Sequence, residues 1–188
     1  MKKNIVLYFI LSFAFSQGEG GENVDLLGHL EFGQNTSDIT GFYQDGREFV
    51  AIGLQNASAI VDVTDPFNPY EIIRIPGGNS MWRDLKYWDR YVYVGTEANN
   101  NNGIQVISLD DPDNPVLVYT INDMGNSHNI HIDTDGFLYV VGASDCDIWI
   151  YNLENPANPI QVGCWNGEYI HDLEVYNNKA YACGIYSG

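Results

Sequence analysis

The sequence has few basic residues. Lys and Arg together number 8 against 25 Asp and Glu, which gives a formal net charge of −17 at pH 7. An acidic surface of this kind repels phosphate backbones and anionic lipid, so we expect no nucleic acid partner. The charge is compatible with divalent cations or basic partners, and equally with plain solubility outside the cell.

Motifs that carry familiar chemistry are also missing. The sequence contains no Gly-x-Ser-x-Gly, phosphate-binding glycine loop, His-Glu-x-x-His or Rossmann fingerprint. Its three cysteines form no Cys-x-x-Cys pair, which argues against a zinc ribbon or a redox role. No extended segment combines helical spacing with caps, so helical repeats are disfavoured. The stretch DTDG at 133–136 lacks the later ligands of a calcium loop and predicts a hairpin turn.

Long hydrophobic runs are confined to the N-terminus. Lys2 and Lys3 precede an apolar run from Ile5 to Phe15, which ends in the small-x-small pattern Ala14-Phe15-Ser16. This pattern predicts a secretory signal peptide over residues 1–16, the alternative being a buried N-terminal helix. Its removal takes away two lysines and no acid, so the net charge moves from −17 to −19. No later stretch is long enough for a transmembrane segment.

A repeated turn motif dominates the rest of the chain. It reads DVTDPFNP at 62–69, LDDPDNP at 109–115 and LENPANP at 153–159, with spacings of 46 and 44 residues between the first prolines. Such a period is typical of four-stranded propeller blades. The first Pro fixes φ for a turn, the preceding Asp or Asn accepts a backbone hydrogen bond, and the second Pro begins an outer strand. We therefore expect a hairpin between two outer strands.

Short β-branched and aromatic runs divide each unit into four strands. The sequence thus predicts an all-β fold, a β-propeller of four-stranded antiparallel blades of which about three and a half are present. The expected blades are about 37–77, 78–123 and 124–167, with a partial one at 168–188, and they follow an N-terminal segment at 17–36. Within that segment, residues 23–30 are interpreted either as a strand that closes the ring or as a loosely packed arm. Because the last unit is incomplete, we expect an exposed sheet edge.

Two of the cysteines fall on adjacent strands of the third unit. An antiparallel register that pairs Cys146 with Cys164 would place Ile148 opposite Val162 and Ile150 opposite Ile160. In an exported protein we expect these cysteines to form a disulfide. Cys183 is left over, either as a free buried thiol or with a partner beyond this chain.

The repeats resemble a known family. AIVDVTDPFNP, IQVISLDDPDNP and IWIYNLENPANP look like LVIVD repeats, and the pentad is best kept at Ile60-Val61-Asp62. SDITGFYQDGREFVAIGL, WRDLKYW, SHNIHIDTDGFLYVVGA and IHDLEVY occur in this order and resemble the secreted choice-of-anchor B proteins over residues 23–188. The resemblance implies an exported β-propeller-like domain at the surface of a bacterium or outside it, and it implies no established activity.

Polar residues recur where each predicted first strand begins. These are Asp38, Arg83, Asp84, His128, Asn129, His171 and Asp172. Because first strands line a propeller's axis, we expect these residues to converge as a ring at one mouth of the channel and to bind a ligand there. Asp84, His128, His171 and Asp172 are also candidate ligands of a divalent cation or acid–base groups. The alternative is that the polar groups only hydrogen-bond loops between blades. His29 and His131 fit no ring and are expected on the surface.

These features favour a non-catalytic binding or scaffold module, with an extracellular protein or a carbohydrate as partner. They identify no cofactor, although the ring could bind a divalent cation. The alternative is a metal-dependent extracellular hydrolase or lyase that uses the Asp and His ring. A third hypothesis is a structural adhesin subunit. Aromatic side chains near strand ends would provide a stacking surface or fill gaps between blades: Tyr43, Trp82, Trp88, Trp165 and Tyr169.

Overall fold

The computed structural model describes residues 24–98 and 103–186, and the predicted signal peptide at 1–16 lies outside them. The described residues form fourteen antiparallel strands and no helix, so the all-β prediction is confirmed. Sheet 1 contains β1 (Thr36–Gln44), β2 (Arg47–Leu54), β3 (Ala57–Asp62) and β4 (Tyr70–Pro76). Sheet 2 contains β5 (Leu85–Trp88), β6 (Tyr91–Val94), β7 (Ile104–Ser108) and β8 (Val116–Ile121). Sheet 3 contains β9 (Asn129–Ile132), β10 (Phe137–Val141), β11 (Ile148–Asn152) and β12 (Ile160–Trp165). The C-terminal hairpin contains β13 (Asp172–Tyr176) and β14 (Lys179–Cys183).

Tight turns join the first and second strands. Asp45-Gly46, Asp89-Arg90 and Asn177-Asn178 all have positive φ values at both positions. Two central residues of positive φ make the turn whose twist matches the flanking strands of a hairpin, and Asn, Asp and Gly adopt that conformation at the least cost. These turns therefore set the register of the first hairpin in sheets 1 and 2.

The proline motif forms the turn between the third and fourth strands. In sheet 1 the backbone N–H of Asn68 donates to the carbonyl of Asp65 at 3.0 Å, and the Asp65 carboxylate accepts from Phe67 N and Asn68 Nδ2. Asp111 and Asn114 repeat this arrangement in sheet 2, and sheet 3 keeps the backbone bond from Asn158 to Asn155. Asn thus serves as a side-chain donor to the turn rather than as a residue of positive φ.

The predicted register of β11 and β12 was wrong. Ile148 lies opposite Trp165 and Ile150 opposite Gly163, and a bulge follows at Ile150/Tyr151. Cys146 precedes β11 and bonds to Cys164 from outside the ladder, so the disulfide is confirmed although the cysteines are not opposite each other in it. Bulges at Ile60/Val61 and Val106/Ile107 occupy the equivalent place in sheets 1 and 2. Each bulge inserts one residue into the outer strand and shifts the pairing beyond it.

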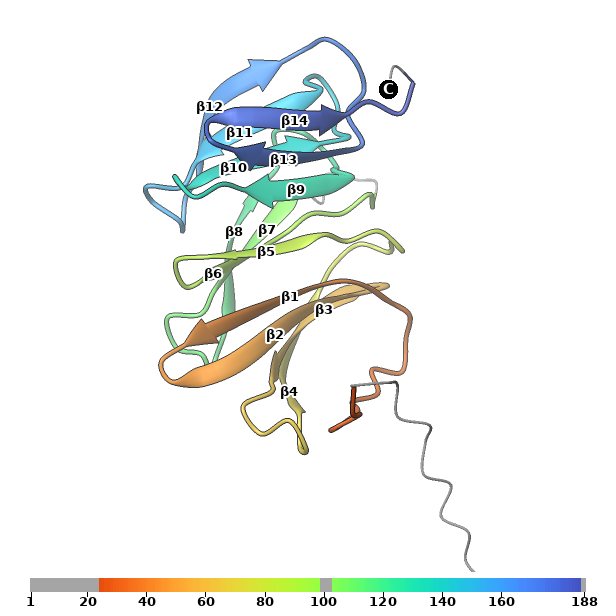
Figure 1. Cartoon of the computed structure of the whole chain (residues 1–188), viewed down its shortest axis with the longest axis vertical. Helices are drawn as coiled ribbons and strands as arrows, with labels where there is room; N and C mark the ends of the chain where they lie inside the picture. The colour runs from red at the N-terminus through yellow and green to blue at the C-terminus, as the bar shows by residue number, and fades with distance from the viewer. Residues whose placement is uncertain (1–23, 99–102, 187–188) are drawn as a thin grey trace, which may run out of the picture.

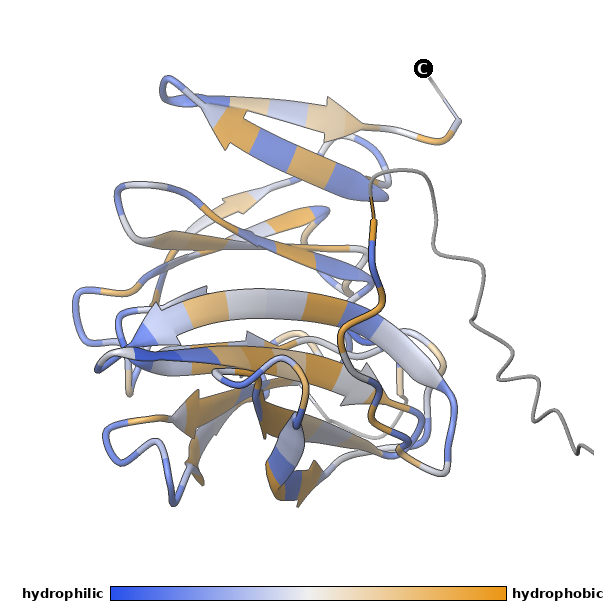
Figure 2. Cartoon of the chain, turned by 60° about the horizontal axis from the view of Figure 1, so that its bottom comes forward, coloured by the Kyte–Doolittle hydropathy of each residue, from blue (hydrophilic) through white to orange (hydrophobic). Residues whose placement is uncertain are grey.

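Apolar side chains fill the space between successive sheets. In sheet 2 the alternation of β6 sends Val92 and Val94 toward sheet 1, where they pack with Ile60, and Tyr93 toward sheet 3, where it packs with Leu138. A smaller cluster joins sheet 3 to the hairpin, whose alternating apolar and polar positions are visible in Figure 2. Each fully buried aliphatic side chain contributes roughly 1.5–3 kcal/mol, so this contact between sheets is the main source of stability.

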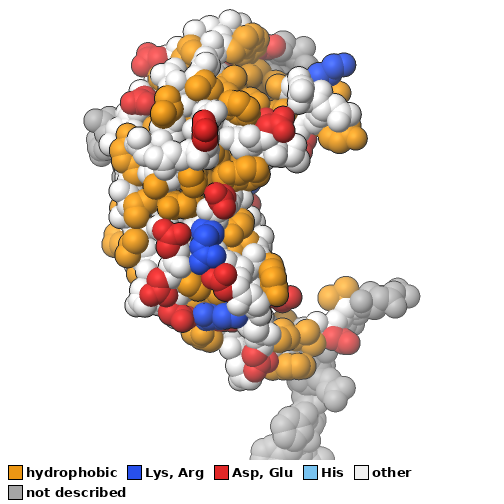
Figure 3. All heavy atoms as spheres, turned by 90° about the vertical axis from the view of Figure 1, so that its left-hand side faces the viewer, with side chains coloured by type: hydrophobic (Ala, Val, Ile, Leu, Met, Phe, Trp, Pro, Cys, Tyr) orange, Lys and Arg blue, Asp and Glu red, His pale blue; other side chains and the backbone are white. Residues whose placement is uncertain are grey.

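The three sheets and the hairpin follow one another in chain order (Figure 1). Their first strands are neighbours, because β1 contacts β5, β5 contacts β9 and β9 contacts β13. Ion pairs add to the junction of sheets 1 and 2 at the end that carries the tight turns: Arg47 bonds Asp113 at 2.7 Å and Arg90 bonds Asp45 at 2.8 Å. Figure 3 shows basic side chains flanked by acidic ones on this face.

The described part of the chain is not a closed structure, since none of its sheets closes on itself. Residues 24–30 contain only an isolated bridge at Val24 and no strand, and Gly28 packs against Pro66 and Pro69 of the first proline turn. The role of 23–30 in closing a ring stays a prediction. Among the described residues no helix is both long and apolar enough to cross a membrane.

The disulfide gives a direct test of the fold. Replacing both Cys146 and Cys164 with alanine removes a crosslink between residues 18 apart. We expect the free energy of unfolding to fall by about 3 kcal/mol, because the crosslink restricts the unfolded chain. Urea denaturation measures this loss. Cys183→Ser is the matched control, since Cys183 is a free and exposed cysteine of the described residues, and it should leave stability unchanged. Equal effects of the two variants would contradict the assigned bond.

Candidate functional site

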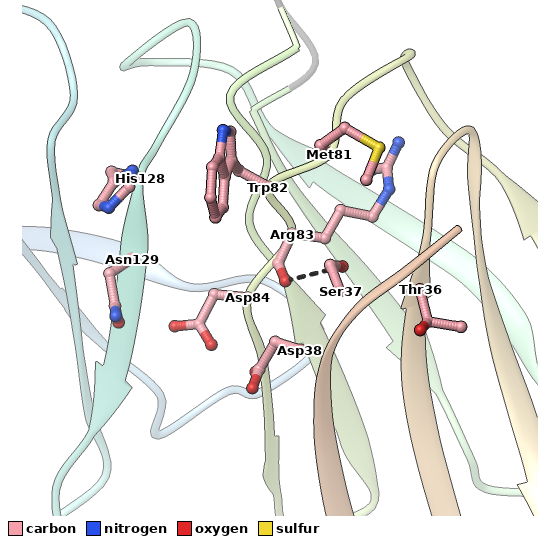
Figure 4. A pocket seen from close by; sticks show the side chains of 9 residues that line it. All are labelled: Thr36, Ser37, Asp38, Met81, Trp82, Arg83, Asp84, His128 and Asn129. Carbon is pink, nitrogen blue, oxygen red and sulfur yellow. Dashed lines mark hydrogen bonds between the residues drawn. The ribbon is translucent and has the colours of Figure 1, made fainter.

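The starts of the first strands surround an open cavity of about 670 Å³. It is lined by Thr36, Ser37, Asp38, Met81, Trp82, Arg83, Asp84, His128 and Asn129 (Figure 4). These residues come from the beginnings of β1, β5 and β9, which belong to three different sheets. The structure therefore brings together five of the seven residues predicted for the site: Asp38, Arg83, Asp84, His128 and Asn129.

Asp38 reaches the cavity from a bulge in β1. Thr36 pairs with Leu54 and Ile39 with Ile52, so Ser37 and Asp38 share the single partner position of Gly53. A bulge re-aims side chains, and here it directs Asp38 toward sheet 2. A Cβ atom on Gly53 would lie 2.2 Å from Ser37 Oγ and 2.9 Å from Arg83 Cβ, so only glycine fits opposite this bulge.

Each aspartate at the cavity holds the first strand of the next sheet. Asp38 Oδ2 accepts a hydrogen bond of 3.0 Å from the backbone N–H of Leu85 in β5. Asp84 Oδ2 accepts one of 2.7 Å from the N–H of Ile130 in β9. Equivalent positions of two successive units thus do the same work, and each carboxylate bonds a strand amide of the next unit rather than the loops between blades that the predicted alternative named.

Asp38 and Asp84 also hydrogen-bond to each other, which requires a proton on one of the two carboxyl groups. Burial and the hydrogen bond to Asp38 raise the pKa of Asp84 to about 7. Burial works to raise the pKa of Asp38 as well, but the hydrogen bonds from Asp84 and from the amides of Leu85 and Ile39 hold it below its ordinary value. Lys86 Nζ lies 2.8 Å from Asp84 Oδ1 and 3.7 Å from Asp38 Oδ2, which favours one negative charge on the pair.

Arg83 lines the cavity but directs its guanidinium away from the two aspartates (Figure 4). Its Nε donates to the carbonyl of Leu54 at 2.7 Å, and its Nη2 donates to the carbonyl of Gly78. The side chain is 3% exposed, and burial lowers its pKa. Arg83 therefore stabilises the junction of sheets 1 and 2, and its charge is not presented to a ligand.

The side chains of His128 and His171 contact each other where β9 and β13 begin. Their Nε2 atoms are 2.7 Å apart and their ring centroids 4.1 Å apart. Glu97, in the loop after β6, accepts a hydrogen bond from His128 Nδ1. The backbone around His128 is crowded, because a Cβ atom on Gly142, whose φ is +65°, would lie 2.3 Å from His128 Cβ.

The four predicted metal ligands do not gather as one set. Asp84 is committed to Asp38, Lys86 and Ile130, and Asp172, which is exposed, accepts a hydrogen bond from its neighbour Leu173. In residues 24–98 and 103–186 no group of three or more His, Cys, Asp or Glu side chains is arranged to hold a metal ion. Of the four, the structure pairs only His128 with His171.

The predicted aromatic residues divide between the two expected roles. Trp82 is 60% exposed and lines the cavity beside Met81, with its ring 6.3 Å from that of His128. Trp88 instead packs against the cluster between sheets 2 and 3. Tyr43 lies near the far end of β1 and is exposed. Among the five predicted aromatic residues, Trp82 is thus the one that lines this cavity.

Sequence reasoning missed four side chains of the site: Thr36, Ser37 and Met81 line the cavity, and Glu97 bonds His128. It also misplaced His131, which was expected on the surface but is largely buried, accepts from Val175 N and pairs with Glu174. A glycine lies next to the last residue of the second strand of every unit, at Gly53, Gly95, Gly142 and Gly184. This recurrence was available in the sequence, and at the first three glycines it marks where Ser37, Ser127 and His128 approach the backbone.

Comparison with known proteins adds no identity. No family model matches the chain, and no curated protein is significantly similar to it.

The shared proton makes stability depend on pH. A pKa raised in the folded state means that the contribution of Asp84 is fully present below about pH 4 and is lost as the pH rises through about 7. Asp84→Asn mimics the neutral acid. Between pH 4 and 7 we expect the free energy of unfolding of the unmodified protein to fall by more than about 1 kcal/mol relative to this variant, as measured by urea denaturation. The free energy of unfolding of Asp172→Asn, a substitution at the equivalent but exposed position, should change with pH as it does in the unmodified protein. The same pH dependence in Asp84→Asn would disprove the shared proton.

Arg83 is tested by Arg83→Met, which keeps the stem and removes the donors. Two carbonyl groups lose a charged partner, so we expect a loss of about 2–3 kcal/mol in the free energy of unfolding. Arg74→Met is the control, because Arg74 bonds Glu71 and the carbonyl of Phe32 from a partly exposed position on an outer strand, and its loss should cost under about 1 kcal/mol. Comparable losses in the two variants would contradict a structural role specific to Arg83.

Proposed function

We propose that the chain is an extracellular binding module of the LVIVD-repeat, choice-of-anchor B type, a β-propeller whose channel mouth binds a carbohydrate without catalysis. The observation that carries this proposal is the cavity at the starts of β1, β5 and β9, because one ligand there contacts three repeats at once. Propeller-like folds bind ligands at open sites of this kind, which several structural elements form together.

The chemistry of the cavity fits a neutral polyhydroxylated ligand. Trp82 offers an exposed indole face for the apolar side of a sugar ring. The carboxylate of Asp38, the amide of Asn129 and the imidazole of His128 offer hydrogen-bond acceptors and donors close to that face. With the guanidinium of Arg83 turned away and Lys86 paired, the described lining presents no unpaired cation for an anionic ligand.

Three repeated features support the propeller, and the disulfide supports the export. The proline turns recur every 46 and 44 residues, the sheets have four antiparallel strands, and successive first strands lie side by side. A disulfide is expected in an oxidising compartment, which fits the predicted signal peptide.

The alternative of a metal-dependent hydrolase or lyase receives less support. It requires Asp84 and Asp172 as ligands or acid–base groups next to both histidines, and within the described residues these side chains form no such cluster. Asp84 instead holds β9 through Ile130.

The proposal is tested by titrating neutral trisaccharides of glucose and of N-acetylglucosamine into the full chain. Tryptophan fluorescence and calorimetry report binding. We expect at least one of them to bind, and Trp82→Ala to weaken that binding about tenfold, because the stacking face is lost. Tyr43→Ala removes an equally exposed aromatic far from the cavity and should change nothing. Binding that survives Trp82→Ala, or no saccharide binding at all, would refute the carbohydrate assignment.

A further inference from the structure

The equivalent positions of the two histidines in the repeat and their backbone hydrogen bonds hold the pair in place. His128 and His171 occupy equivalent positions immediately before β9 and β13, which lie side by side. Each backbone N–H donates at 2.9 Å to the last strand residue of its own hairpin partner, Val141 for His128 and Cys183 for His171. The two imidazoles therefore face each other because the repeat places them there.

Glu97 determines which nitrogen of His128 carries the proton. A carboxylate accepts only, so His128 Nδ1 is the donor and, in the neutral ring, Nε2 keeps a lone pair. Glu97 is itself positioned by its backbone N–H, which donates to the carbonyl of Trp82 at 3.3 Å. A carboxylate on one ring nitrogen with the other nitrogen free is the arrangement that orients histidine ligands in metal sites.

The lone pair of His128 points at a second imidazole nitrogen. At 2.7 Å the two Nε2 atoms form a hydrogen bond, in which His171 Nε2 donates to the lone pair of His128. A cation that replaces this proton requires the two nitrogens to move apart. A tetrahedral zinc ion, with bonds of about 2.0–2.1 Å, holds two nitrogens about 3.3 Å apart. A small rotation of either ring supplies that difference. The side chain of His128 is 17% exposed, so an ion there would be partly shielded from solvent.

Ligand type limits which cation fits. Two imidazole nitrogens favour zinc and its neighbours such as copper and nickel, whereas magnesium and calcium require oxygen ligands. Asp38 and Asp84 are occupied by Leu85, Ile130 and Lys86, so they do not complete a shell. An ion on the two histidines would keep open positions for water or for an exogenous ligand, as zinc does outside purely structural sites.

We propose that His128 and His171, oriented by Glu97, bind one divalent transition cation of the zinc class at the rim of the cavity. This site goes beyond the carbohydrate proposal and does not depend on it, because its test uses the metal alone. His128 also lines the cavity, so the open positions of the ion face the same mouth.

The experiment is calorimetric titration of ZnCl₂ into the untagged full chain that carries Cys183→Ser, which removes the exposed thiol as a competing ligand. We expect one equivalent to bind. His171→Gln should weaken binding at least tenfold while keeping a donor for His128, and Glu97→Gln should weaken it about 10–100-fold. His29→Ala removes an exposed histidine and should change nothing. Excess MgCl₂ should not compete.

Circular dichroism and urea denaturation confirm that each variant is folded, and His128→Gln serves as a second ligand variant if His171→Gln is not. The absence of stoichiometric zinc binding, equal binding by folded ligand variants and the parent, or displacement by MgCl₂ would overturn the proposal. Failure of saccharide binding leaves the zinc result unaffected, so the two proposals fail separately.

Discussion

The packing of sheet against sheet is the constraint on which the rest of this molecule depends. A four-stranded sheet with apolar residues on both faces is not stable in water by itself, and sheet 2 is such a sheet, with Val92 and Val94 on one face and Tyr93 on the other. Stacking covers both faces and brings the first strands side by side. The polar residues at the starts of those strands converge as a result, so the site follows from the core.

The site in turn strengthens the stack that forms it. Asp38 and Asp84 bond backbone amides of the following sheet, and Arg83 bonds carbonyls of the preceding one. These bonds engage Asp38, Asp84 and Arg83, which the sequence had predicted as ligand-binding residues. What remains open to solvent is narrower: part of the Asp38 carboxylate, the indole of Trp82, the amide of Asn129 and the two histidines with Glu97.

Strand order and turn chemistry could be predicted because they depend on neighbours in sequence. The proline motif and the Asp-Gly turn are determined by residues close together in the sequence, and they recur with a period of about forty-five residues. Each predicted turn lies where the structure has one. The register of β11 and β12 was not predicted correctly, because it was derived from a ladder pair of Cys146 and Cys164, whereas Cys146 precedes β11 and Cys164 lies opposite Trp149. Glu97 was missed for a related reason: it lies in a loop of sheet 2, 31 residues before the histidine it contacts, and no periodic signal links the two.

The bond between Cys146 and Cys164 has a mechanical consequence. Because each sheet contacts mainly its neighbours, a chain pulled from its ends would be expected to lengthen in steps, one unit at a time. The crosslink spans 18 residues, which would otherwise extend to about 60 Å. The disulfide prevents this length from being released when the chain is pulled, so the third unit yields a shorter step than the first two unless a reductant is present.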